Sequence, residues 1–202
     1  MKVAYHYMNL PNRLTLARFI LTMVMIVLAA LPPSTTENLL HWKIGFVIGF
    51  IAGVTDFLDG YLARKFDLVT DFGKFMDPLV DKIFTVSGFV ILVQQGHLPG
   101  WVAIVILTRE FGVTGLRGMA AAKGEVIAAV PIGKLKTLLQ MLTLLLGGFI
   151  WVGWLSLDMK LPGINLGLET IWITVYWVVA AITVYSGIDY FIKGRNLYVK
   201  EL

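Results

Sequence analysis

Four aspartates within one short stretch are the residues of this sequence best suited to chemistry. They form two pairs, Asp56 with Asp59 and Asp77 with Asp81. Because helical residues three or four positions apart share a face, each pair would place its carboxylates on one side of a helix. The segment between the pairs contains charged residues and a glycine, which suit a reversal of the chain. Two helices joined there could bring both pairs face to face.

Such a cluster of carboxylates needs cations. Four converging carboxylates would repel one another, and most would stay protonated unless positive charge neutralised them. Ligand sets made only of oxygen suit hard divalent ions such as Mg²⁺ or Mn²⁺. We therefore predict two divalent metal ions, an arrangement that commonly serves displacement at phosphorus. The alternative, four solvated carboxylates at a membrane boundary, is disfavoured because the pairs are helically phased and Gly60 and Ala63 keep the face between them open.

The rest of the chain is apolar enough to lie in lipid. Of 202 residues, 57% are hydrophobic and 15% charged, and the mean hydropathy is +0.78, which is too apolar for an ordinary soluble domain. The net charge of +4 suits a surface of anionic lipid headgroups better than nucleic acid, since no basic run alternates with aromatic residues. The absence of cysteine excludes disulfides and thiolate metal sites.

Six apolar runs predict an all-α integral membrane fold, because about 20 helical residues cross roughly 30 Å of hydrocarbon. We expect no cleavable signal peptide before the first run, and residues 1–10 suit either a short interfacial helix or a disordered terminus. No repeat or linker divides the chain, so residues 1–202 are expected to form one domain. The six spans are predicted at residues 14–31, 42–62, 78–94, 101–121, 135–154 and 168–192.

The distribution of cations predicts the orientation in the membrane. With six spans, fourteen Lys and Arg residues fall on the side of the two termini, and only Lys43 and Lys160 fall on the other. Positively charged loops stay in the cytoplasm. Both termini and the aspartates are therefore expected on the cytoplasmic side, in a bacterial plasma membrane. Within the second span, glycines recur every four residues from 45 to 53, which allows close helix packing and could also fix the neighbouring aspartates.

The spacing of the aspartate stretch resembles the CDP-alcohol phosphotransferase motif at every fixed position. The resemblance implies an integral membrane enzyme, expected as a homodimer, that transfers a group from a CDP-linked lipid or alcohol to a second hydroxyl compound and releases CMP. It further implies that the four aspartates hold two divalent metals, that Asp81 is the general base, and that the other motif residues border the cytidine diphosphate. The matching residues are Asp56, Asp59, Gly60, Ala63, Arg64, Gly73, Asp77 and Asp81.

A second group of polar residues lies near the start of the first span. Asn12, Thr15 and Arg18 recur every three residues and so share one side of that helix. Taken alone, they suit snorkelling or capping groups at an interface. Related enzymes carry a similar pattern near the nucleotide pocket, so the resemblance favours contact with the CDP-lipid.

Arg109 and Glu110 lie inside the fourth predicted span, where an unpaired charge costs on the order of 2.5–3.5 kcal/mol or more. One interpretation is a buried ion pair that locks helices together. The other is that Arg109 joins Arg117, Lys134 and Lys136 in an anion pocket, since Arg109 and Arg117 are about two turns apart. Basic groups beyond those needed for the pyrophosphate would mean that the acceptor itself carries a phosphate.

Residues 108–140 resemble the corresponding stretch of bacterial phosphatidylglycerophosphate synthases, a branch of the same family. The resemblance implies transfer of a phosphatidyl group from CDP-diacylglycerol to sn-glycerol 3-phosphate. Inositol phosphate, phosphatidylglycerol and serine remain alternative acceptors. A divalent-cation transporter is the alternative from another class, but it would spread carboxylates through the depth of the bilayer, whereas the four aspartates here cluster towards one face.

Overall fold

The computed structural model describes residues 10–32, 39–65, 71–125, 127, 131–160 and 167–197. Within these ranges, the side chains of residues 10, 11, 56–65, 71, 74 and 131 are outside the description. The regular structure of the described residues is helical, apart from one isolated bridge between Lys160 and Gly167. The interfacial helix expected at residues 1–10 falls almost wholly outside the described residues.

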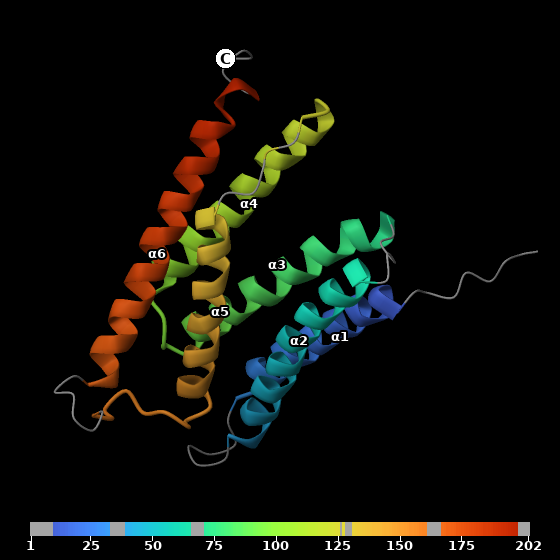
Figure 1. The fold of residues 1–202 in the computed structure, drawn as a ribbon. Coiled ribbons are helices and arrows are strands. Elements are labelled where there is room, and N and C mark those ends of the chain that lie inside the picture. Colours follow the sequence, from blue (N-terminus) through green and yellow to red (C-terminus); the bar gives the residue numbers. More distant parts are fainter. Residues whose placement is uncertain are drawn as a thin grey trace, which may run out of the picture. The chain divides into compact units, whose positions relative to one another are not determined.

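Each predicted span coincides with one helix over most of its length (Figure 1). Three of them, over Asn12–Ala30, Ile132–Trp151 and Leu168–Lys193, are long and apolar enough to cross a membrane by length and composition. The described part of the chain is therefore all-helical with the character of a membrane protein, as predicted. The helices are α1 (Leu10–Ala30), α2 (Leu40–Lys65), α3 (Asp71–Gln94), α4 (Gly100–Ala122), α5 (Pro131–Trp151) and α6 (Leu168–Lys193), followed by the short 3-10 helix η1 (Arg195–Leu197).

Several helix boundaries differ from the predicted spans by a few residues, and two of them involve a proline. Helix α3 begins at Asp71, so Pro78 lies inside it rather than at its start. The fixed φ of proline suits a helix, and the turn before Pro78 is tied to α1 by a hydrogen bond from Thr15 to Asp77. Helix α5 begins at Pro131, a residue pre-organised for the first helical position, and ends at Trp151.

The chain divides into two compact units, residues 1–87 and residues 88–202, with the boundary inside α3. In unit 1, α1 and α2 run side by side in opposite directions (Figure 1). The indole Nε1 of Trp42, near the start of α2, donates to the carbonyl of Leu31, just after α1 ends, at 3.0 Å. Farther along, Gly49 approaches Met25 so closely that an added Cβ would be 2.5 Å from the Met25 Sδ. The contacts fix an antiparallel register for the two helices.

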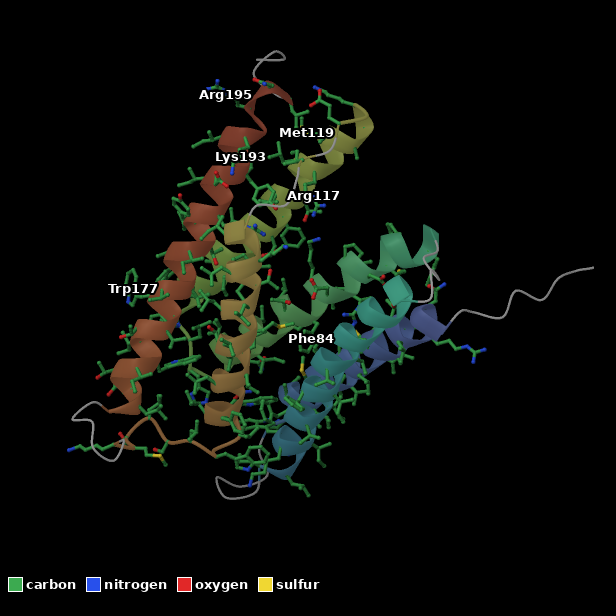
Figure 2. The ribbon with its side chains drawn as sticks, viewed as in Figure 1. Phe84, Arg117, Met119, Trp177, Lys193 and Arg195 are labelled. Carbon is green, nitrogen blue, oxygen red and sulfur yellow. The ribbon has the colours of Figure 1, made fainter. Side chains whose placement is uncertain are left out.

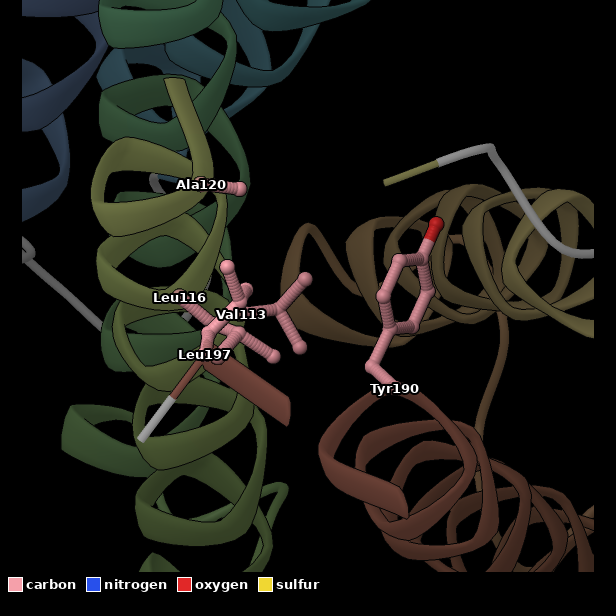
Figure 3. Packing of buried hydrophobic residues seen from close by; sticks show 5 residues of the cluster. All are labelled: Val113, Leu116, Ala120, Tyr190 and Leu197. Atoms are coloured by element: carbon pink, nitrogen blue, oxygen red, sulfur yellow. The ribbon is translucent and has the colours of Figure 1, made fainter. Parts of the chain in front are cut away.

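In unit 2, α4 and α6 run parallel to each other. Near their starts, Trp101 packs on Trp177 with ring centroids 4.6 Å apart, and Trp172 Nε1 donates to the carbonyl of His97 at 2.6 Å. Near their ends, a hydrophobic cluster joins the two helices and η1 (Figure 3). Its buried members are Val113, Leu116, Ala120, Tyr190 and Leu197.

Helix α5 runs against α6 in the opposite direction. Gln140 Nε2 donates to Thr183 Oγ1 at 3.4 Å, and nearer the other end Gly147 lies against Leu92 and Trp172. After Trp151 the helix is terminated by Gly153, whose φ of +75° only glycine adopts without strain. The N–H of the next residue returns to the carbonyl of Phe149, which completes a Schellman turn.

Candidate active site

The register of unit 1 brings the aspartate-bearing turns to one end of its three helices. Met25 lies opposite Gly49 in the antiparallel pair α1 and α2. Each step along α1 from Met25 towards its start therefore corresponds to a step along α2 towards its end. This places Arg18 at the level of Asp56, and Thr15 at the level of Asp59.

The first turns of helix α3 lie at the same end of unit 1 as the end of α2. Phe84 (Figure 2) packs against Gly53 of α2, where an added Cβ would be 3.6 Å from the Phe84 Cζ. Asp81 lies one turn before Phe84 on α3, and Asp56 lies one turn after Gly53 on α2. Since α3 leaves the end of α2 in the opposite direction (Figure 1), both aspartate pairs belong to adjacent turns of neighbouring helices.

The two aspartates of α3 are half-buried and lie on one helix face, as their four-residue spacing predicts. The hydroxyl of Thr15 donates to Oδ1 of Asp77 at 2.6 Å, and Thr15 itself is fully buried. This bond uses one lone pair of the carboxylate and fixes its orientation, while its remaining lone pairs can still serve a cation. The side chains of Asp56 and Asp59 lie outside the described residues.

The donor set suits hard divalent cations. Two carboxylates from successive turns of α3, one of them oriented by a hydroxyl, offer the oxygen ligands that Mg²⁺ and Mn²⁺ prefer. Among the side chains that the structure describes, no group of three or more metal-ligating side chains is found. Two of the four predicted aspartate ligands fall outside that set, so the predicted ligand set stays a prediction.

The polar group at the start of α1 lies at this same end. Asn12 and Thr15 are buried, and Arg18 is fully buried despite its length. A guanidinium enclosed by protein does not snorkel towards water, so that alternative does not fit Arg18. Of the other motif residues, Gly73 is buried in the first turn of α3. Gly60, Ala63 and Arg64 belong to the last turns of α2, whose side chains are outside the description. Their contact with the CDP-lipid stays a prediction.

In unit 2, the largely buried carboxylate of Glu110 connects two of the four predicted phosphate-binding cations. The Lys136 ammonium forms an ion pair with Oε1 of Glu110, and the Arg109 Nη1 lies 3.4 Å from the same oxygen. The Lys136 side chain is 5% exposed and that of Arg109 11%. Of the two interpretations drawn from the sequence, the ion pair that links helices is therefore observed, and it joins α4 to α5.

Helix α6 completes the surroundings of Arg109. The Arg109 Nη2 donates to Oγ of Ser186 at 2.9 Å, and the guanidinium carbon lies 5.3 Å from the centroid of the Tyr190 ring. Gly187 permits this approach, since an added Cβ would be 3.2 Å from Cγ of Arg109. Sequence reasoning missed Ser186 and Tyr190; the available signal was a row of polar residues at helical spacing, with Thr183, in an otherwise apolar span.

The other two cations, Arg117 and Lys134, are exposed (Figure 2 labels Arg117). Arg109 and Arg117 are about two turns apart, but eight residues of helix leave a rotation of about 80° between them. That rotation turns Arg109 towards Ser186 and leaves Arg117 at the surface of unit 2. The structure therefore separates an inner pair of cations from an outer pair.

Comparison with known proteins agrees with the aspartate motif. The sequence model of the CDP-alcohol phosphatidyltransferase family matches residues 8–185, which includes all four aspartates and the four predicted phosphate-binding cations. The chain belongs to this family. The resemblance inferred from the motif is thereby confirmed.

Individual relatives are similar along nearly the whole chain. A Bacillus subtilis protein named CDP-diacylglycerol–glycerol-3-phosphate 3-phosphatidyltransferase is 39% identical over 92% of this chain and 95% of its own. A Rickettsia typhi protein of the same name is 36% identical over 91% of this chain and 95% of its own. A Mycobacterium tuberculosis protein named probable phosphatidylglycerophosphate synthase is 37% identical over 90% of this chain and 79% of its own.

Proposed function

We propose that this protein transfers the phosphatidyl group of CDP-diacylglycerol to sn-glycerol 3-phosphate, forming phosphatidylglycerophosphate and CMP in phospholipid biosynthesis. The observation that carries this proposal is the agreement among relatives from three distant bacteria. Each is at least 36% identical over at least 90% of this chain, and each carries a name for this one reaction.

Asp56, Asp59, Asp77 and Asp81 would hold two divalent ions, Mg²⁺ or Mn²⁺. Bound there, such ions would stabilise negative charge on the pyrophosphate as CMP leaves. The half-buried carboxylates of α3 and the hydrogen bond that orients Asp77 support this assignment. Which of the two metals is used depends on coordination geometry and supply rather than on the identity of the ligands.

The chain's own residues then carry out the displacement. Asp81 accepts the proton of the glycerol hydroxyl, whose oxygen attacks the lipid-linked phosphorus in line with the departing CMP oxygen. The P–O bond to the lipid phosphate forms as the bond to CMP breaks. A carboxylate is a weak base for an alcohol, so positioning must supply much of the rate. Contact with the CDP-lipid would come from Asn12, Thr15, Arg18, Gly60, Ala63, Arg64 and Gly73.

The acceptor phosphate would be bound by the cations of unit 2, namely Arg109, Arg117, Lys134 and Lys136. Arg109 and Lys136 are enclosed and already held by Glu110, whereas Arg117 and Lys134 are exposed. We infer that the exposed pair attracts the dianion and the enclosed pair fixes it. A planar guanidinium can bind two phosphate oxygens at once, which gives orientation as well as affinity.

All six helices would span the bacterial plasma membrane, with both termini and the active site in the cytoplasm. Helices α2, α3 and α4 have 26, 24 and 23 residues, and at about 1.5 Å per residue each is long enough to cross roughly 30 Å. In unit 2, Arg117, Lys193 and Arg195 gather at one end (Figure 2), and aromatic residues gather at the other. That asymmetry supports a cytoplasmic cationic end. We expect a homodimer of single-domain chains, as the family resemblance implies.

The function is tested with purified protein, CDP-diacylglycerol, Mg²⁺ or Mn²⁺, and a panel of acceptors scored by CMP release. We expect sn-glycerol 3-phosphate to give the highest kcat/KM. A higher kcat/KM with inositol phosphate, phosphatidylglycerol or serine would contradict the proposed acceptor. It would still support phosphatidyl transfer from CDP-diacylglycerol. Metal flux into protein-loaded liposomes without CMP release with any acceptor would instead support a transporter.

A further inference from the structure

A cluster of charged side chains lies between α4, α5 and α6. Arg109 and Lys136 both contact the same oxygen of Glu110, and the three side chains are at most 12% exposed. Polar groups in such an enclosed setting are ordinarily matched by a protein partner or a bound ligand. A donor of this cluster that lacks a protein partner therefore indicates where an anion would bind.

The Nε of Arg109 is a donor of this kind. Its Nη1 faces Glu110 and its Nη2 donates to Ser186, at 3.4 and 2.9 Å. Its Nε is buried and has no hydrogen-bond partner in the part of the chain that the structure describes. A buried guanidinium N–H is costly to leave unmatched, and Nε with a neighbouring Nη is the edge that binds phosphate oxygens in pairs.

Helix α6 determines which way that edge points. The Ser186 hydroxyl holds one end of the guanidinium, the Tyr190 ring lies 5.3 Å from its central carbon, and the Gly187 backbone leaves room for the side chain. Without these contacts, the Arg109 side chain could adopt other rotamers. Pre-orientation reduces the entropy lost when a ligand binds.

We propose that Ser186 and Tyr190 are positioning residues that, with Glu110, hold the Arg109 guanidinium in advance for the phosphate monoester of the acceptor. This inference rests on the proposed function for the identity of the acceptor. Neither residue touches the reacting atoms; both act through Arg109. Their loss should therefore weaken acceptor binding and leave the chemical step and the CDP-lipid largely unchanged.

The experiment uses the full chain in detergent or nanodiscs. KM values for both substrates are measured by CMP release, and the Kd of sn-glycerol 3-phosphate by titration calorimetry. We expect Ser186→Ala to raise the KM and the Kd for glycerol phosphate about fivefold to tenfold, because a charge-assisted hydrogen bond is lost. Tyr190→Leu should raise both about threefold, because the cation–π contact is lost. In both variants kcat and the KM for CDP-diacylglycerol should stay within twofold.

Two controls come from the same helix. Thr183→Val removes another buried hydroxyl one turn away, which accepts from Gln140 and forms no hydrogen bond with Arg109 among the described residues. Tyr185→Leu removes an aromatic ring that is 63% exposed. Both controls should leave the glycerol phosphate Kd within twofold. Should Ser186→Ala not yield folded protein, the comparison of Tyr190→Leu with Tyr185→Leu answers the same question.

The outcomes separate this proposal from the proposed function. Normal CMP release with an unchanged glycerol phosphate KM in Ser186→Ala and Tyr190→Leu would overturn positioning and leave the function standing. An equal loss in Ser186→Ala and Thr183→Val, or a joint change of kcat and both KM values, would mean a structural role and also overturn it. Wild-type protein that binds glycerol phosphate in a Ser186-dependent way, but releases no CMP, would support positioning and overturn the function.

Discussion

The hydrogen bond from Thr15 to Asp77 connects Thr15 directly to one of the predicted metal ligands. Both residues lie at the end of unit 1 where the aspartate-bearing turns meet, and the 2.6 Å bond fixes one carboxylate before any cation arrives. Groups that orient a ligating carboxylate affect metal affinity without touching the metal. Thr15 can therefore influence the reaction through Asp77 even if the CDP-lipid never reaches it.

Replacing Thr15 should weaken metal binding. We expect Thr15→Val to reduce Mn²⁺ affinity about tenfold, the lower end of what loss of an orienting partner costs. Electron paramagnetic resonance of free Mn²⁺ measures this without turnover. The matched control is Thr22→Val, which removes a fully buried hydroxyl on the same helix that donates only within α1, to the carbonyl of Arg18. Equal affinity in both variants would contradict the role of Thr15.

Removing the proposed base should stop the reaction. We expect Asp81→Asn to lower kcat by at least about 10²-fold, because an amide cannot accept the proton of the glycerol hydroxyl. CDP-lipid binding, measured by equilibrium dialysis, should be largely retained. The exposed pair of Asp189 and Lys193 supplies a control, and Asp189→Asn should leave kcat within twofold. Normal turnover in Asp81→Asn would exclude Asp81 as the base.

At the scale of elements, glycines allow the helices to approach closely on particular sides. Gly49 faces Met25 of α1, whereas Gly53 faces Phe84 of α3. The glycine spacing in α2 therefore serves two different neighbours. Gly49 lets α1 pack closely against α2, and Gly53 lets α3 pack beside the turn that carries Asp56. The same glycines therefore serve helix packing and the placement of the aspartates.

Alanine substitutions should change stability in opposite directions at a glycine in close helix contact and at a glycine with open space around it. A Cβ at Gly147 would be 2.5 Å from Leu92 and 2.9 Å from Trp172, whereas a Cβ at Gly118 would meet nothing within 4 Å. We expect Gly147→Ala to destabilise unit 2 by about 1–3 kcal/mol through overpacking. Gly118→Ala should stabilise α4 by about 0.5–1 kcal/mol. Thermal unfolding in detergent would show opposite shifts in Tm; equal shifts would contradict the packing of α5.

At the scale of the whole molecule, orientation in the membrane is the open question, and unit 2 has a cationic end opposite an aromatic one (Figure 2). In unit 2, the parallel course of α4 and α6 and the reversed course of α5 are what three successive membrane crossings would produce. Because the sequence contains no cysteine, each end can be labelled through a single introduced thiol.

Labelling in intact cells would decide the orientation. We expect Arg195→Cys, at the cationic end, to react with an impermeant maleimide only after the membrane is permeabilised. Asp158→Cys, an exposed position after α5, should react without permeabilisation. The reversed pattern would place the termini outside and would conflict with a cytoplasmic active site. Labelling of both positions from one side would argue against the odd number of crossings between them.

The sequence by itself determined which segments are helical and which residues form the motif. Apolar runs of about 20 residues predicted all six helices, and the spacing of four aspartates identified the family that the profile comparison then confirmed. Helix boundaries near Pro78 and Pro131 were less well predicted, because a proline can start a helix or be tolerated within one.

Only the tertiary structure decided which polar side chains meet. The spacing of Arg109 and Arg117 does not reveal that one is enclosed by α6 and the other exposed, nor does the pattern in α1 reveal that Thr15 bonds to Asp77. Such partnerships depend on how far each helix is rotated and shifted against its neighbours. Hydrophobic periodicity fixes those quantities poorly when most faces of a helix are apolar, as they are throughout this chain.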